Sequence, residues 1–133
     1  METNTLWAAL VGGTSAWAAF LIGGVDNLFK AFVTLMVLDY ILGIMAAYVN
    51  KNIDSKRAFV GLLKKTSMVM MVIAAVQLDT AVDAEGLMRN AMVLFLVGME
   101  GISFVENLGH MGINPPNWVK EAFSQLQDKG GNK

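Results

Sequence analysis

Three acidic residues, Asp39, Asp79 and Glu100, interrupt stretches of the sequence that are otherwise almost entirely apolar. An ionisable side chain in such a stretch is expensive to place in a membrane, so it is a functional candidate by default. Asp39 falls on one helical face with Gly43 and Ala47, and these small residues would let another helix approach the acid closely. For each acid, the structural alternative is a protonated carboxyl group hydrogen-bonded to a neighbouring helix.

Glu100 begins a polar stripe along its own predicted helix. Ser103 and Asn107 follow it at helical spacing, with apolar residues on both flanks. Such a strip suits a contact lined by water. The candidate pore or assembly residues are therefore Asp39, Gln77, Asp79, Glu100, Ser103 and Asn107.

No recognisable catalytic or metal-binding arrangement accompanies these acids. Asp79, which follows Gln77 toward the end of its apolar stretch, is expected at the membrane interface, facing solvent or Arg89. Asp39 is expected near the middle of a different stretch, so the two aspartates differ in depth and do not suit an aspartyl pair. His110 is the single histidine, and the chain has no cysteine, which excludes a thiolate nucleophile and the common zinc sites. We expect no enzymatic activity and no cofactor.

The elements that must position these residues are membrane-spanning helices. The chain has 133 residues, of which 55% are hydrophobic and 16% are charged, a composition too apolar for an ordinary soluble domain of this size. A span needs about 20 apolar residues to cross a hydrocarbon core of about 30 Å. The sequence predicts an all-α membrane protein with four spans, at about 6–24, 31–49, 66–82 and 90–105.

Two of these spans leave alternatives open. The first could be a signal peptide. A signal peptide has a positively charged segment before its apolar stretch, but no Lys or Arg precedes this span. The fourth is short, and Glu100 offsets most of the insertion free energy of its apolar residues, at about 3 kcal/mol for a central acid. This segment could instead lie in the membrane interface.

The basic residues predict the orientation of the chain. We expect residues 1–112 to form the transmembrane region, with a basic loop over residues 50–65, and residues 113–133 to be cytoplasmic. Four spans place eight Lys and Arg residues on one side and two on the other, so both termini should face the cytoplasm. A three-span arrangement would leave five positive charges on one side and four on the other, which nearly removes the bias. The eight residues are Lys51, Lys56, Arg57, Lys64, Lys65, Lys120, Lys129 and Lys133.

The net charge of −1 gives no basic field for nucleic acid. The expected partners are instead the lipid bilayer and other copies of the chain. In the first span, small residues recur at three- and four-residue steps, which favours close helix packing, although Gly12 and Gly13 together could simply loosen the helix. This ridge consists of Ala8, Gly12, Ala16, Ala19 and Gly23.

A breaker cluster over residues 112–117 precedes a predicted amphipathic helix. Its apolar face suits a segment lying on the membrane surface. The alternative is a tail helix packed on another protein surface, and the final residues from Asp128 to Lys133 are expected to be mobile. The apolar face consists of Trp118, Val119, Ala122, Phe123 and Leu126.

Several short segments together resemble the toxin secretion/phage lysis holin family. They are Asp39-Tyr40-Ile41-Leu42-Gly43, Ser55-Lys56, Gly61-Leu62-Leu63-Lys64-Lys65, Leu78-Asp79, Arg89-Asn90 and Glu100-Gly101-Ile102-Ser103-Phe104-Val105-Glu106-Asn107. The resemblance covers about residues 30–126, and the segment from Gly112 to Pro116 with the helix after it looks like the family's C-terminal section. One departure is Gly98, where a polar residue such as Asn would be expected.

The resemblance implies a phage or prophage holin in the cytoplasmic membrane of a host bacterium. Such a protein oligomerises and opens lesions through which a cell-wall-degrading endolysin, or a large toxin, leaves the cell. Two other classes stay open at this point. One is a small ion or solute channel or a transporter subunit, and the other is a non-conducting scaffold, including an antiholin that blocks a partner's assembly.

Overall fold

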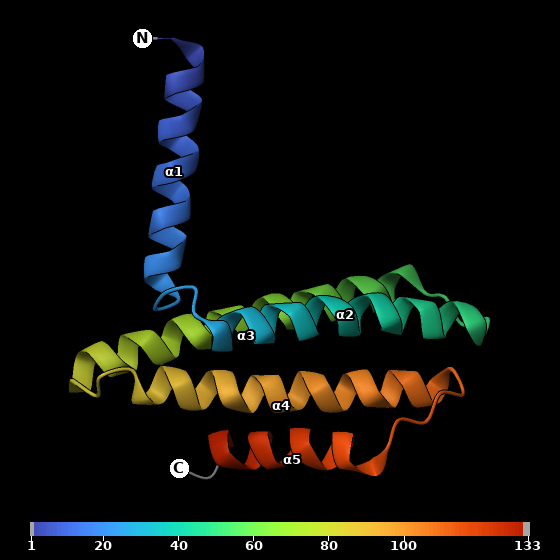
Figure 1. Ribbon diagram of the computed structural model, residues 1–133. Helices are drawn as coiled ribbons and strands as arrows, with labels where there is room; N and C mark the ends of the chain where they lie inside the picture. Colours follow the sequence, from blue (N-terminus) through green and yellow to red (C-terminus); the bar gives the residue numbers. More distant parts are fainter. Residues whose placement is uncertain (1, 132–133) are drawn as a thin grey trace.

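The computed structural model describes residues 2–131, which form five α-helices joined by turns and short extended segments (Figure 1). Three turns join the first four helices, and the breaker cluster at Pro115 and Pro116 separates the fifth from them. The helices are α1 (Thr3–Leu21), α2 (Asn27–Val49), α3 (Ser55–Val82), α4 (Leu87–His110) and α5 (Asn117–Gly131).

Helix α4 is the centre of the molecule. Helices α2 and α3 pack on one side of it, and α5 packs on the opposite side, antiparallel to α4 (Figure 1). The order is therefore a layer of two helices, the central helix, and a single outer helix. Helix α1 projects away from this bundle, crosswise to the other four (Figure 1).

A small apolar core joins the three helices α2, α3 and α4. Phe32 of α2, Val72 of α3 and both Val93 and Leu96 of α4 are fully buried in it. The outward faces of α2 and α3 carry many exposed apolar side chains, such as Ile44, which is 43% exposed. Exposed apolar surface of this extent suits contact with lipid.

Three helices, α2, α3 and α4, are long and apolar enough to cross a membrane. The predicted four spans are therefore not confirmed, because α1 does not meet this standard. Gly12, Gly13, Thr14 and Ser15 occupy the middle of α1 and lower its hydropathy. No residue of α1 is buried, and a Cβ atom added at Gly12 or Gly13 would meet nothing within 4 Å. The first part of the proposed packing ridge, with Gly12, is thus open, whereas Ala16, Ala19 and Gly23 lie beside Val76 of α3.

The prediction of a basic loop over residues 50–65 was wrong. Helix α3 begins at Ser55, where the side chain of Asp54 accepts hydrogen bonds from the backbone N–H groups of Lys56 and Arg57. A carboxylate at this position satisfies backbone donors that have no partner within the helix. The loop is accordingly short, and it includes Lys51. The other four basic residues of the predicted loop, Lys56, Arg57, Lys64 and Lys65, belong to α3.

Helix α5 lies on α4, so the alternative of a tail helix on a protein surface describes it better than a helix free on the membrane. Three glycines allow the close approach. A Cβ atom at Gly98 would lie 2.6 Å from the carbonyl oxygen of Phe123, and one at Gly130 would lie 2.8 Å from the Cα of Phe95. A Cβ atom at Gly101 would overlap the ring of Phe123.

The face of α5 that meets α4 is rotated from the predicted apolar face. Gln127 and Gly130 lie against α4 together with Phe123, whereas Trp118 is 69% exposed. Backbone approach at the glycines, rather than side-chain apolarity alone, sets this rotation. Asp128 to Gly131 are helical, contrary to the predicted mobile tail, and residues 132–133 lie outside the described range.

Candidate functional site

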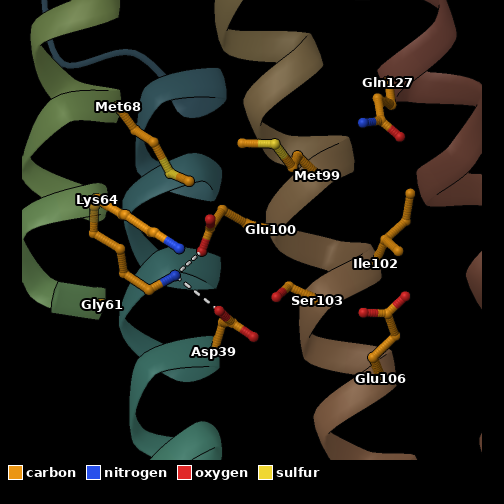
Figure 2. A pocket seen from close by; sticks show the side chains of 11 residues that line it. Asp39, Gly61, Lys64, Met68, Met99, Glu100, Ile102, Ser103, Glu106 and Gln127 are labelled. Atoms are coloured by element: carbon orange, nitrogen blue, oxygen red, sulfur yellow. Dashed lines mark hydrogen bonds and ion pairs between the residues drawn. The ribbon is translucent and has the colours of Figure 1, made fainter. Parts of the chain in front are cut away.

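A buried ion cluster joins the three central helices. The Lys65 ammonium group of α3 donates a hydrogen bond of 2.8 Å to Asp39 Oδ2 of α2 and a second one to Glu100 Oε2 of α4. Dashed lines in Figure 2 mark both ion pairs. The side chains of Asp39 and Glu100 are 7% and 2% exposed, and that of Lys65 is 13% exposed. One cation thus neutralises two acids from different helices.

The cluster lies deep in the bundle. At about 1.5 Å per residue, Asp39 is about 18 Å from the start of α2, Lys65 about 15 Å from the start of α3, and Glu100 about 20 Å from the start of α4. These depths correspond to the middle of a hydrocarbon core of about 30 Å. A buried charge needs a partner and hydrogen bonds to be tolerated there. No buried side-chain nitrogen or oxygen among residues 2–131 lacks a partner.

Asn107 completes the coordination of Asp39. Its side-chain amide donates a hydrogen bond of 2.8 Å to Asp39 Oδ1 and a longer one to the Asp39 backbone carbonyl. Gly43, one turn after Asp39, faces the same amide, since a Cβ atom there would lie 3.4 Å from Asn107 Nδ2. Gly43 therefore leaves room for the amide between α2 and α4.

Two clefts reach the cluster from the surface. One has a volume of about 390 Å³ and is lined by Ser103 and Glu106 of α4 and Gln127 of α5, as well as the ion cluster (Figure 2). The other has a volume of about 370 Å³ and is lined by residues of α2 and α3, including Tyr40. Lys65 and Asp39 line both clefts, so the ion pair is a thin partition between two spaces large enough for water.

A second polar cluster lies at the end of the bundle where α4 begins. Arg89, which is 4% exposed, donates to the backbone carbonyls of Ile22 and Gly24 and to the carboxylate of Asp26. These bonds attach the turn between α1 and α2 to the start of α4. The hydrogen bond from Arg89 holds the pKa of Asp26 below its usual value of 3.8. The carboxylate therefore stays ionised, and the attachment intact, until the pH falls below that value.

Asp79 belongs to this end, although it neither faces solvent nor pairs with the Arg89 side chain. It is buried and accepts hydrogen bonds of 2.8 Å from the backbone N–H groups of Met88 and Arg89. A carboxylate at a helix N-terminus satisfies free donors and complements the helix dipole. Asp79 thus caps α4, whereas Gln77 is exposed on α3.

The sequence analysis missed Lys65 and Arg89 as buried cations. The pair Lys64-Lys65 resembles the charged boundary of a span, and this predicts a loop position for Lys65. The apolar run Phe59–Leu63 before them and the capping residue Asp54 were the signals that α3 starts earlier. Two buried acids on neighbouring helices were a further signal, because they require a cation.

The site suits an electrostatic and structural role. Among residues 2–131 there is no group of three or more His, Cys, Asp and Glu residues that could hold a metal ion. The ion cluster can instead hold three helices together while its charges stay internal, and it can release them if water or another helix provides new partners.

The fold and the buried cluster define a small integral membrane protein with at least three apolar helices of spanning length. The bacteriophage holin family model matches residues 16–128. The chain therefore belongs to the bacteriophage holin family, as its motifs had indicated.

Three relatives illustrate this similarity. A probable holin of Bacillus phage phi105 is 30% identical over 86% of this chain and 84% of its own length. An uncharacterised protein of Halalkalibacterium halodurans is 36% identical over 96% of both chains. An uncharacterised protein of Listeria innocua is 32% identical over 91% of this chain and 86% of its own. No solved structure matches the chain significantly.

Proposed function

We propose that this chain is a holin that oligomerises in the cytoplasmic membrane of a host bacterium and opens lesions that release an endolysin. Family membership and the similarity to the probable holin of phage phi105 support the holin role. The observation that carries the mechanism is the ion cluster, in which Lys65 is shared between Asp39 and Glu100. Before the lesion opens, both termini face the cytoplasm.

The cluster gives the single copy a way to stay closed in lipid. With the buried polar side chains paired internally, helices α2, α3 and α4 present mainly apolar residues of α2 and α3 to the membrane. The pairing is unequal, since two acids share one ammonium group. A second copy or water entering the adjoining clefts can satisfy the acids equally well, so the closed and assembled states need differ by only a few kcal/mol.

A bacterial expression assay tests the proposal. The chain is expressed from an inducible promoter while membrane potential and release of a folded cytoplasmic enzyme are followed together, with and without an endolysin. We expect both to change abruptly at one time, and the endolysin to lyse the cells only then. Collapse of the potential with the enzyme retained would show a small channel instead. If the chain had no effect when expressed alone but delayed the lysis caused by another holin, it would be an antiholin.

The two clefts favour the small channel as the second candidate. Both are lined by Asp39 and Lys65, and each is large enough for several waters. An ion or proton could pass between them if the Lys65–Asp39 pair opened. The size of the released solute separates this candidate from the holin.

A further inference from the structure

Helix α5 has a polar outer face whose contact with lipid would be unfavourable. The helix runs antiparallel along α4, with Phe123 at Gly101, Gln127 at Gly98 and Gly130 at Phe95. At about 1.5 Å per residue, its 15 residues cover about 22 Å, most of a hydrocarbon core of about 30 Å. Wherever α4 crosses the membrane, docked α5 lies at the same depth.

Apart from Trp118, which is 69% exposed, the exposed side of α5 is hydrophilic. Its residues form a continuous shallow groove on the surface, and three of them are charged. At about 2.5 to 3.5 kcal/mol for each charged residue in the middle of a bilayer, three together would cost about 9 kcal/mol in lipid. Lipid therefore cannot cover this face. The groove residues are Asn117, Lys120, Glu121, Ser124, Gln125 and Asp128.

The opposite side of the bundle, formed by α2 and α3, is mainly apolar. Many exposed residues of α2 and α3 are apolar there, for example Ile44 at 43% and Met70 at 62% exposure. Because α5 and the α2–α3 layer lie on opposite sides of α4 (Figure 1), each copy has one side suited to lipid and one suited to water. Copies arranged in a ring with α5 innermost would satisfy both sides.

The polar cleft beside the ion cluster continues this hydrophilic side inward. Gln127 of α5 lines this cleft together with Ser103, Glu106 and Glu100 of α4 (Figure 2). Water along α5 would therefore reach the cleft and the acids at its base. The contact between α4 and α5 is also specific, because the backbone at Gly98 leaves no room for a side chain.

We propose that in the open assembly α5 remains packed on α4 and its groove face lines the water-filled passage. Before opening, α5 lies on the cytoplasmic side, and docking at Gly98, Gly101 and Gly130 brings the hydrophilic face to membrane depth. The inference rests on the holin function proposed above, and it names the surface that water contacts.

Two substitutions test the docking. Full-length protein is reconstituted in vesicles of phosphatidylethanolamine and phosphatidylglycerol, and release of trapped fluorescent dextran is measured. Gly98→Leu should lose release, because its side chain would meet the backbone of α5. Gly109→Leu is the matched control on the same helix, since a Cβ atom at Gly109 meets nothing within 4 Å, and it should release dextran as the unmodified protein does. Equal release by both variants would overturn the inference.

A disulfide between α4 and α5 gives a second test that does not depend on the folding of Gly98→Leu. The chain has no native cysteine, and Gly131 lies beside Phe95, so Phe95→Cys with Gly131→Cys places two thiols on neighbouring segments of α4 and α5. Formation of the disulfide that joins them is checked on a non-reducing gel. The oxidised pair should still release dextran, as a docked open state requires. Loss of release on oxidation, restored by reduction, would show that docking closes the protein and would overturn the inference.

A third comparison locates the passage. Gln125→Cys on the groove face and Ile44→Cys on the lipid-facing side are each modified with a bulky hydrophilic maleimide. Modification at Gln125→Cys should reduce dextran release, and modification at Ile44→Cys should not. Equal effects would place α5 outside the passage. If the unmodified protein released no dextran at all, the proposed function itself would fail, an outcome distinct from these.

Discussion

Lys65 is the residue on which the polar groups of three helices converge. Its ammonium group holds Asp39 and Glu100 together, while Asn107 holds the remaining oxygen of Asp39. The cation and the acids therefore make opposite contributions to the closed bundle. Removing the cation leaves two like charges facing each other, whereas removing one acid leaves a balanced pair.

The first prediction concerns the cation. Lys65→Met should permeabilise earlier than the unmodified protein at matched membrane levels, because loss of one partner of a buried pair costs about 3 to 5 kcal/mol and favours any state that hydrates the acids. Lys64→Met is the matched control: it removes the same charge from the neighbouring, exposed residue. The time at which membrane potential collapses after induction is the measurement. Identical timing in the two variants would contradict the role of the cluster.

The second prediction concerns the acid at the centre of the family-like motif. Glu100→Leu should accumulate stably and permeabilise late or not at all, because it removes a central acid that disfavours lipid by about 3 kcal/mol and leaves Lys65 paired with Asp39 alone. Glu100→Gln keeps a hydrogen-bond acceptor for Lys65 and should retain part of the activity. Release of the cytoplasmic enzyme is followed at equal protein levels. If Glu100→Leu kept the normal schedule, Glu100 would only be a satisfied buried acid, and Asp39 would become the main candidate.

At the scale of the elements, α1 and α5 differ in what fixes them. Helix α5 is held on α4 by close contacts at glycines. Helix α1 buries no residue, and the turn that follows it is attached to the bundle by hydrogen bonds from Arg89. A helix that is apolar all round, as α1 is, is normally covered by lipid or protein. The first part of its ridge, around Gly12, is therefore available to other copies.

The third prediction tests that ridge. Gly12→Leu should weaken self-association, because a large side chain blocks close approach between helices, and the space around Gly12 within one copy is open. Gly13→Leu is the control, since Gly13 is equally open but lies off the ridge. Crosslinked oligomers and the time of lysis are the readouts. Unchanged oligomers and timing in Gly12→Leu would remove α1 from the assembly interface.

At the scale of the whole molecule, the charges at the two ends of the bundle indicate its orientation. Lys51, Lys56 and Arg57 gather at the turn between α2 and α3, while the buried Arg89 is already paired with Asp26 at the opposite end. Free positive charge is retained on the cytoplasmic side. The end that carries the α2–α3 turn should therefore be cytoplasmic.

The fourth prediction is this topology. Reporter fusions at Ile53 should read cytoplasmic and fusions at Glu85 external. A fusion before Thr3 should also read cytoplasmic, because α1 carries no charged residue with which to lie on a membrane surface. It would turn from its crosswise position and cross as a further span. An external signal at the N-terminus would leave three spans, and an external signal at Ile53 would contradict the orientation as a whole.

The sequence by itself determined the membrane class, the helical fold and the family, because these depend on local properties. Long apolar runs predict helices of spanning length wherever they occur. Helical spacing placed Asp39 on a face of small residues, and it placed Glu100 and Asn107 on one polar stripe. The structure brings these three residues together. Their part in assembly stays a prediction.

Only the tertiary structure decided which groups are partners. The sequence alone places Lys65 in a loop, whereas the structure shows that Asp54, eleven residues earlier, caps α3. It also places Asp79 at the interface, whereas the structure shows that Asp79 caps α4. Likewise, Gly98 looked like a departure from the family pattern, although it is where the α5 backbone meets α4. Pairing and backbone approach depend on the relative placement of helices far apart in the chain, and the period of a single helix carries no information about that placement.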